Sequence, residues 1–221
     1  MVAPRSLIFL LTTGLLLAAA PAASAAECVA IEDFANAKVG EFPPGWKLRK
    51  DEGRGVYSVR QEGPLRFLHA ASRGVGIQAA KEQEWNLSVH PVLAWSWRPV
   101  EFPKGSDERK SKSNDSALSV YAVFPHSPVS VKALKYIWSA VVPVGTALTS
   151  SGGLTQARVV RSGPGKDGEW VEQQVNVLED YKKRFGESEV PKPAGIAVLT
   201  DSDDTKSSAK GDYASFRVCK P

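Results

Sequence analysis

The segment PVLAWSWRPV, residues 91–100, indicates the class of fold. Every second position is apolar, since Leu93, Trp95 and Trp97 alternate with smaller or polar residues and Arg98 follows on the other parity. Side chains two positions apart lie on the same face of a strand. The stretch therefore predicts a strand whose tryptophans enter a core and whose Arg98 points outward.

Similar short runs rich in Val, Ile, Tyr, Phe and Trp recur between clusters of Gly, Pro, Asn, Asp and Ser. One helix is expected near 177–185, because Asn176 can cap it and Gly186 can end it. The expected strands are residues 29–34, 55–60, 65–70, 76–80, 91–100, 116–124, 134–142, 156–161, 169–175, 195–200 and 211–219. This pattern predicts an all-β fold, a two-sheet jelly-roll β-sandwich, with residues 26–221 forming one domain.

Residues 1–25 have the pattern of a secretion signal peptide. Arg5 precedes an apolar run at 7–17, and Ala23, Ser24 and Ala25 are small residues suited to cleavage. A retained membrane anchor is the alternative, but the run is shorter than the roughly 20 residues that a bilayer requires. We expect cleavage, no membrane anchor afterwards, and a periplasmic or secreted protein.

The two cysteines, Cys28 and Cys219, lie at opposite ends of the mature chain. An oxidising compartment favours a disulfide between them over two free thiols. Such a bond requires the first and last strands to be neighbours.

The formal net charge is +4. Part of this charge lies in residues 104–112, which we interpret as a solvated loop. The sequence contains no recognisable nucleic-acid-binding module, so nucleic acid is not expected as a partner. A glycan, including an anionic one, is compatible with this charge.

An aromatic residue on a polar strand face suggests where such a glycan would bind. Trp170 shares its face with Glu172 and Gln174, while Val171 and Val175 occupy the other side. Sugar rings can stack on aromatic side chains while their hydroxyls and carboxylates bind cations and amides. The predicted ligand-binding residues are Arg98, Trp170, Glu172, Gln174, Tyr213 and Arg217. The alternative is an exposed sheet face with scattered aromatics, which needs no ligand.

An acidic loop offers oxygens to a hard cation such as calcium. Asp201, Asp203 and Asp212 are the candidate metal ligands. Lys206 stands where an EF-hand loop requires glycine, so the loop is not an EF-hand. A structural turn, in which the aspartates accept backbone N–H groups, is the favoured interpretation. No other cofactor is expected.

The sequence contains no catalytic motif. Its three histidines lack metal-ligand spacing, and no Gly-x-Ser-x-Gly segment is present. A glycosidase needs only two suitably separated carboxylates, for which Glu172 is the first candidate and Asp201 or Asp203 the second.

Several short groups of residues occur in an order that resembles a known family. They are Asn114-Asp115-Ser116-Ala117, Tyr136-Ile137-Trp138, Glu179-Asp180-Tyr181, Phe185-Gly186 and Asp201-Ser202-Asp203-Asp204-Thr205. The chain thus resembles the exported bacterial proteins of domain of unknown function family 3047. The resemblance implies a β-sandwich and no established activity. Asp204 stands where the family would be expected to carry Asn.

Three functional hypotheses follow. The favoured one is an exported, non-catalytic, carbohydrate-binding-like protein. The second is a glycoside hydrolase or polysaccharide lyase that acts on an envelope glycan. The third is an envelope structural or interaction protein without a small ligand.

Overall fold

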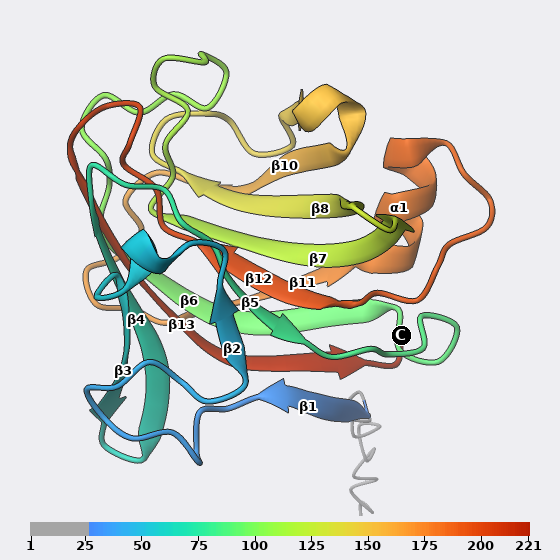
Figure 1. The fold of residues 1–221 in the computed structure, drawn as a ribbon, viewed down its shortest axis with the longest axis horizontal. Coiled ribbons are helices and arrows are strands. Elements are labelled where there is room, and N and C mark those ends of the chain that lie inside the picture. Colours follow the sequence, from blue (N-terminus) through green and yellow to red (C-terminus); the bar gives the residue numbers. More distant parts are fainter. Residues whose placement is uncertain (1–26) are drawn as a thin grey trace, which may run out of the picture.

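The computed structural model describes residues 27–221. Residues 1–26, on which the signal-peptide prediction falls, lie outside the described residues. The described chain forms thirteen strands, one α-helix and two 3-10 turns, arranged as two facing sheets (Figure 1). The predicted jelly-roll sandwich with one short helix is confirmed. Within residues 27–221, no helix has the length and apolar character needed to span a bilayer.

One sheet, sheet A, contains six strands. In spatial order they are β11 (Val171–Asn176), β6 (Val92–Glu101), β13 (Ser208–Cys219), β4 (Leu65–Arg73) and β3 (Tyr57–Glu62), with β1 (Cys28–Glu32) also pairing with β13. All of these pairs are antiparallel.

The other sheet, sheet B, contains seven strands. In spatial order they are β2 (Trp46–Leu48), β5 (Ala79–Glu82), β12 (Gly195–Leu199), β7 (Leu118–Ser127), β8 (Ser130–Ser139), β10 (Thr155–Ser162) and β9 (Ala147–Ser150). β8 and β10 run parallel, and the other neighbours are antiparallel.

Aromatic side chains from both sheets fill the core. Trp95 and Trp97 on β6 are fully buried, and their rings meet edge to face at 5.1 Å. Each packs against an aromatic of β8: Trp95 lies 5.9 Å from Tyr136, and Trp97 lies 5.6 Å from Trp138. The alternation of residues 91–100 therefore places the tryptophans between the sheets, as predicted.

The chain ends are joined by the predicted disulfide. β1 pairs with β13 so that Cys28 lies opposite Cys219, and the two form a disulfide bond. The first and last strands are thus neighbours (Figure 1).

The helix α1 (Val177–Phe185) begins and ends where the sequence predicts. The side chain of Asn176 accepts a hydrogen bond from the backbone N–H of Glu179, and Gly186 ends the helix in a left-handed conformation. Tyr181 packs 4.6 Å from Phe124 of sheet B and so attaches the helix to the core.

The loop at residues 104–112 is not fully solvated, contrary to expectation. Asp107 and Glu108 are buried. Glu108 accepts hydrogen bonds from the hydroxyls of Ser116 and Ser139, at 3.1 and 2.5 Å. Buried carboxylates require hydrogen-bond partners of this kind. The bond from Ser139 also attaches the loop to β8.

Candidate functional site

Sheet A has one face toward the core and one toward the outside, which we call the outer face. The strand register places four side chains in a row across the outer face. Arg98 pairs with Asp212, and Asp212 pairs with His69 on the next strand. Trp170 immediately precedes β11, beside Arg98. The row therefore runs from Trp170 at one edge to His69.

Arg98 is held by two carboxylates and two aromatic rings. Its Nε donates to Asp212 Oδ2 at 2.7 Å, and its Nη1 lies 2.9 Å from Glu62 Oε2. Its Cζ lies 4.6 Å from the ring centroid of Trp170 and 5.2 Å from that of Phe67. These distances are typical of cation–π contacts, which fix both the cation and the half-buried indole.

Asp212 is the buried anchor of this row. Its side chain is 3% exposed, and its Oδ1 lies 2.6 Å from Nδ1 of His69. Asp212 thus binds His69 through one oxygen and Arg98 through the other. A buried carboxylate with partners at both oxygens is a fixed structural group.

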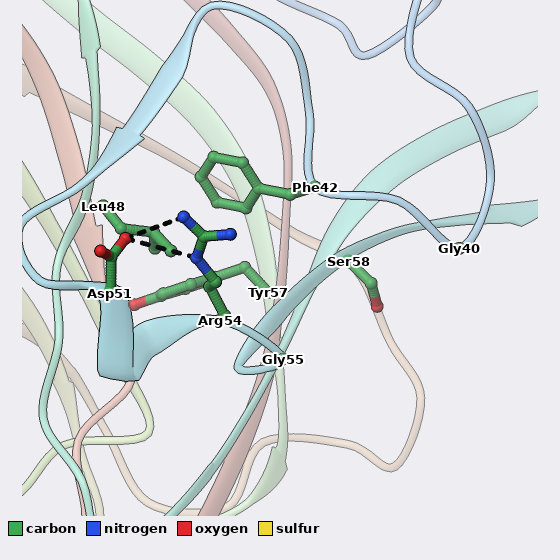
Figure 2. Close-up of a pocket in the computed structure, with 8 residues that line it drawn as sticks. All are labelled: Gly40, Phe42, Leu48, Asp51, Arg54, Gly55, Tyr57 and Ser58. Atoms are coloured by element: carbon green, nitrogen blue, oxygen red, sulfur yellow. Dashed lines mark hydrogen bonds and ion pairs between the residues drawn. The ribbon is translucent and has the colours of Figure 1, made fainter.

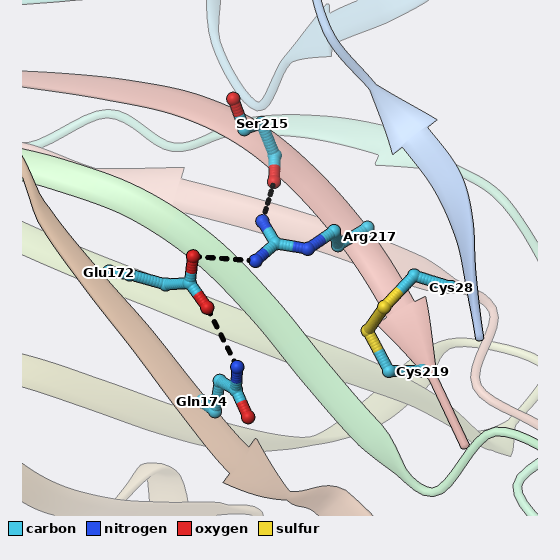
Figure 3. The surroundings of a disulfide bond; sticks show 6 residues. All are labelled: Cys28, Glu172, Gln174, Ser215, Arg217 and Cys219. Atoms are coloured by element: carbon cyan, nitrogen blue, oxygen red, sulfur yellow. Dashed lines mark hydrogen bonds and ion pairs between the residues drawn. A yellow bond between two sulfur atoms is a disulfide. The ribbon is translucent and has the colours of Figure 1, made fainter. Parts of the chain in front are cut away.

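A second polar cluster on the outer face lies near the disulfide (Figure 3). Glu172 binds Arg217 at 2.7 Å and accepts from the amide of Gln174 at 2.7 Å. Arg217 also donates to the carbonyl oxygen of Ser215. The bonds from Gln174 and Arg217 lower the pKa of Glu172. Glu172 is therefore an ionised hydrogen-bond acceptor at neutral pH.

Tyr213 does not belong to the outer face, so its prediction as a ligand-binding residue is wrong. It is fully buried in the core, and its hydroxyl donates to the carbonyl oxygen of Leu199 at 2.9 Å. The cause is a β-bulge in β13, where the register shifts between Ala214 and Arg217 and Ser215 adopts a φ of 55°. A bulge adds one residue and breaks the alternation.

The structure brings the other five predicted ligand-binding residues together on the outer face. They are Arg98, Trp170, Glu172, Gln174 and Arg217. Three supporting residues were not predicted from the sequence. Phe67 contacts Trp170, His69 binds Asp212, and Glu62 binds Arg98. The signal for Phe67 and His69 was present, because they alternate with Leu68 and Ala70 in a strand that was predicted.

Of the three predicted cation ligands, Asp201 and Asp203 lie close together, but Asp212 does not join them. Asp212 lies on the outer face of sheet A with Arg98 and His69, away from the acidic loop. Among residues 27–221, the group of at least three acids whose oxygens all lie within 4.8 Å of one another is Asp115, Asp203 and Asp204.

This acidic loop has the features of a structural turn. Asp115 accepts hydrogen bonds from the backbone N–H groups of Asp204 and Thr205, at 3.1 and 2.7 Å. Burial, together with its neighbour Asp203, raises the pKa of Asp201 to about 8. Asp201 therefore keeps its proton to a higher pH than an ordinary aspartate does.

A pocket of about 660 Å³ lies at the edge of the sandwich beside β3 (Figure 2). Phe42, Leu48 and Tyr57 form its apolar part, and an ion pair between Asp51 and Arg54 lies at its rim. Its other lining residues are Gly40, Gly55 and Ser58. Nothing in the strand periodicity predicted it, because its residues come mainly from a loop and a 3-10 turn.

The solved structures that are similar to this chain include three that are described as follows. "TmCBM61 in complex with beta-1,4-galactotriose" has 9% identity and a TM-score of 0.39, covering 82% of this chain and 92% of its own. The "CBM22-1 xylan-binding domain from Paenibacillus barcinonensis Xyn10C" has 14% identity and a TM-score of 0.36, covering 80% and 85%. The "xyloglucanase domain of NopAA" from Sinorhizobium fredii, in complex with cellobiose, has 11% identity and a TM-score of 0.39, covering 83% and 91%.

No curated protein matches the sequence significantly. A protein-family profile does match, over residues 44–217, and its description is "Protein of unknown function (DUF3047)". The match includes every motif on which the resemblance to this family rested. It covers most of the chain, and the chain therefore belongs to the DUF3047 family.

Proposed function

We propose that the chain is a non-catalytic carbohydrate-binding protein whose ligand lies on the outer face of sheet A. The observation that carries the proposal is the half-buried Trp170, held beside β11 by Arg98 and Phe67. An aromatic ring fixed before the ligand arrives costs little conformational entropy on binding. Its exposed part is available to the C–H face of a sugar ring.

The neighbouring polar groups supply what sugar hydroxyls require. Glu172 is an ionised acceptor, and Arg217 and Gln174 carry several N–H donors. Their bonds to one another orient them, and all three lie on the same outer face as Trp170. A sugar hydroxyl can exchange hydrogen bonds with a cluster of this kind.

The pKa and the hydrogen bonds of the acidic side chains on this face favour binding over glycoside hydrolysis. A glycosidase needs a carboxylic acid with a raised pKa to protonate the leaving group. The pKa of Glu172 is lowered by Gln174 and Arg217, and Asp212 is bound on both oxygens by His69 and Arg98. Neither is arranged as a general acid.

The pocket beside β3 is the alternative location for the ligand. Its volume lies in the range of small-molecule sites, and it combines aromatic walls with a charged pair. Replacing one aromatic side chain at each location, and measuring the affinity for the ligand, shows which location binds it.

Trp170→Ala is expected to weaken binding of a soluble polysaccharide by about 1–3 kcal/mol, by analogy with stacking of bases on aromatic side chains. Phe42→Ala is the matched control and is expected to leave the affinity unchanged. Isothermal titration with each variant checks this. If Phe42→Ala weakens binding and Trp170→Ala does not, the ligand binds in the pocket beside β3. If the Trp170→Ala protein fails to fold, Trp170 is a structural residue.

The chain acts, in this proposal, as one exported domain, periplasmic or secreted, after removal of residues 1–25. The disulfide between Cys28 and Cys219 supports an oxidising compartment. Detection of a mature N-terminus near Ala26 in a periplasmic or culture fraction tests this part.

A further inference from the structure

A second pocket, of about 400 Å³, lies at the end of sheet A where β4 and β6 finish and β13 begins. Three cationic side chains line it: Arg73, Lys104 and Lys206. Among residues 27–221, none of the three takes part in an ion pair. Cations that outnumber the nearby carboxylates repel one another, and an anion would relieve that repulsion.

The one carboxylate in this pocket is already neutralised. Glu101 binds Lys210 at 2.6 Å and accepts a hydrogen bond from the hydroxyl of Ser208. These two bonds, together with the positive charges of Lys210 and Arg73, lower the pKa of Glu101. Glu101 is thus one carboxylate beside four cations, namely Lys210 and the three lining cations, so positive charge remains in excess.

The turn that carries Lys206 is built by the acidic family motif. Asp115 accepts from the backbone N–H of Thr205 at 2.7 Å, and the Thr205 hydroxyl bonds to the hydroxyl of Ser207 at 2.7 Å. Ser207 in turn accepts from the backbone N–H of Lys104 at 3.2 Å. This network holds the backbone near Lys104 and the backbone near Lys206 together at the pocket. Lys206 has a φ of 53°, a left-handed conformation that is uncommon for such a residue and that clusters at functional sites.

Strand β13 connects the pocket with the outer face of sheet A. Ser208 pairs with Arg73, and Asp212, which anchors Arg98, follows four residues later on the same face of β13. At about 3.3 Å per residue, the pocket lies about 13 Å along the strand from the Trp170 row. A short oligosaccharide can reach from one to the other.

We propose that this pocket receives the anionic group of an acidic sugar unit, a carboxylate or a sulfate ester, from a glycan that lies along the outer face. The guanidinium of Arg73 and the ammonium groups of Lys104 and Lys206 bind the anion. The Ser207 hydroxyl and the half-buried Phe102 ring meet the rest of the sugar. This inference rests on the proposed carbohydrate binding and adds the chemical class of the ligand.

The experiment compares acidic polysaccharides with neutral forms of the same backbone. The probes are alginate, polygalacturonate and hyaluronan, each beside its carboxyl-methyl-esterified form, and dextran sulfate beside dextran. We expect the wild-type chain to bind at least one charged form about tenfold more tightly than its neutral form. The carboxylate pairs and the sulfate pair distinguish the two anions. The preference is expected to fall as salt rises.

The double variant Lys104→Gln/Lys206→Gln is expected to bind charged and neutral forms within about twofold of each other. Its matched control is Lys47→Gln/Lys183→Gln, which removes the same charge from exposed positions on β2 and α1. The control is expected to keep the preference.

Each other outcome has a definite meaning. Equal binding of charged and neutral forms by the wild type, or equal loss of preference in both double variants, would overturn the anion pocket and leave carbohydrate binding intact. No binding of any probe by the wild type would overturn carbohydrate binding itself.

Discussion

The guanidinium carbon of Arg98 lies 4.6 Å from the centroid of the Trp170 indole. The same guanidinium donates from Nε to the buried carboxylate of Asp212, at 2.7 Å. The tryptophan at the edge of sheet A is therefore oriented by a charge network that reaches His69 on β4. This coupling makes Asp212 a structural support for the proposed binding face.

Asp212→Asn is expected to lower the free energy of unfolding by about 3–5 kcal/mol, because it leaves the largely buried Arg98 without its main counter-charge. Glu62→Gln is the matched comparison. Glu62 binds the same guanidinium but is 60% exposed, so we expect a loss within about 1 kcal/mol. Urea denaturation measures both. Equal losses would contradict the view that Asp212 anchors the row.

The disulfide is expected to contribute strongly to stability, because it closes a loop with a sequence separation of 191 residues. In the chain-entropy description, such a bond destabilises the unfolded chain by about 5 kcal/mol. Cys28→Ser/Cys219→Ser should lower the free energy of unfolding by up to that amount. A reducing agent should lower the unfolding midpoint of the wild type and leave that of the variant unchanged. An equal midpoint for oxidised and reduced wild type would argue against the prediction.

Stability is expected to fall as pH rises, owing to Asp201. Burial raises its pKa to about 8 in the folded state, while an ordinary aspartate has a value of 3.8. Between about pH 4 and pH 8 the folded chain thus retains a proton that the unfolded chain has already released. The free energy of unfolding falls across this range by up to about 1.4 kcal/mol per pH unit. Asp201→Asn removes this term, so the variant should gain stability relative to the wild type at pH 9 but not at pH 5.

Denaturation midpoints of both proteins at the two pH values check this prediction, and the same difference at pH 5 and pH 9 would refute it. Calcium added at pH 9 separates the two interpretations of the acidic loop. A structural turn predicts no change in midpoint, whereas a bound ion predicts an increase.

The bulge in β13 depends on Ser215, whose φ is 55°. A β-branched side chain is strained there, so Ser215→Val should destabilise the fold by about 1–2 kcal/mol. Ser215→Gly should be neutral or slightly stabilising, because glycine adopts positive φ without strain. Thermal unfolding of the two variants tests this. A valine variant as stable as the wild type would mean that the bulge is not strained.

Much of the fold could be predicted from local patterns, and the exceptions have physical causes. Strand β6 and helix α1 have a regular spacing of apolar residues and clear boundaries. The edge strands β2 and β9 were missed because they have only three and four residues and are stabilised by their partners β5 and β10. The parallel pairing of β8 and β10 involves residues far apart along the chain, which no local signal reveals.

The candidate site illustrates both the strength and the limit of periodicity. Arg98, Trp170 and Glu172 were placed on the correct face because β11 and the part of β6 that pairs with it alternate without interruption. Tyr213 was misplaced because the bulge reverses the alternation within β13. The partners that hold the site together, such as His69 with Asp212, are brought close only by the order of strands in the sheet.

The most direct test of carbohydrate binding is a pull-down and thermal-shift screen of the mature chain against soluble and insoluble envelope polysaccharides, neutral and acidic. We predict retention by at least one polysaccharide and a rise in its unfolding temperature, with no release of shorter sugars. Release of products would point to a glycoside hydrolase or lyase. No retention and no shift with any polysaccharide would contradict carbohydrate binding and favour an envelope protein whose partner is another protein.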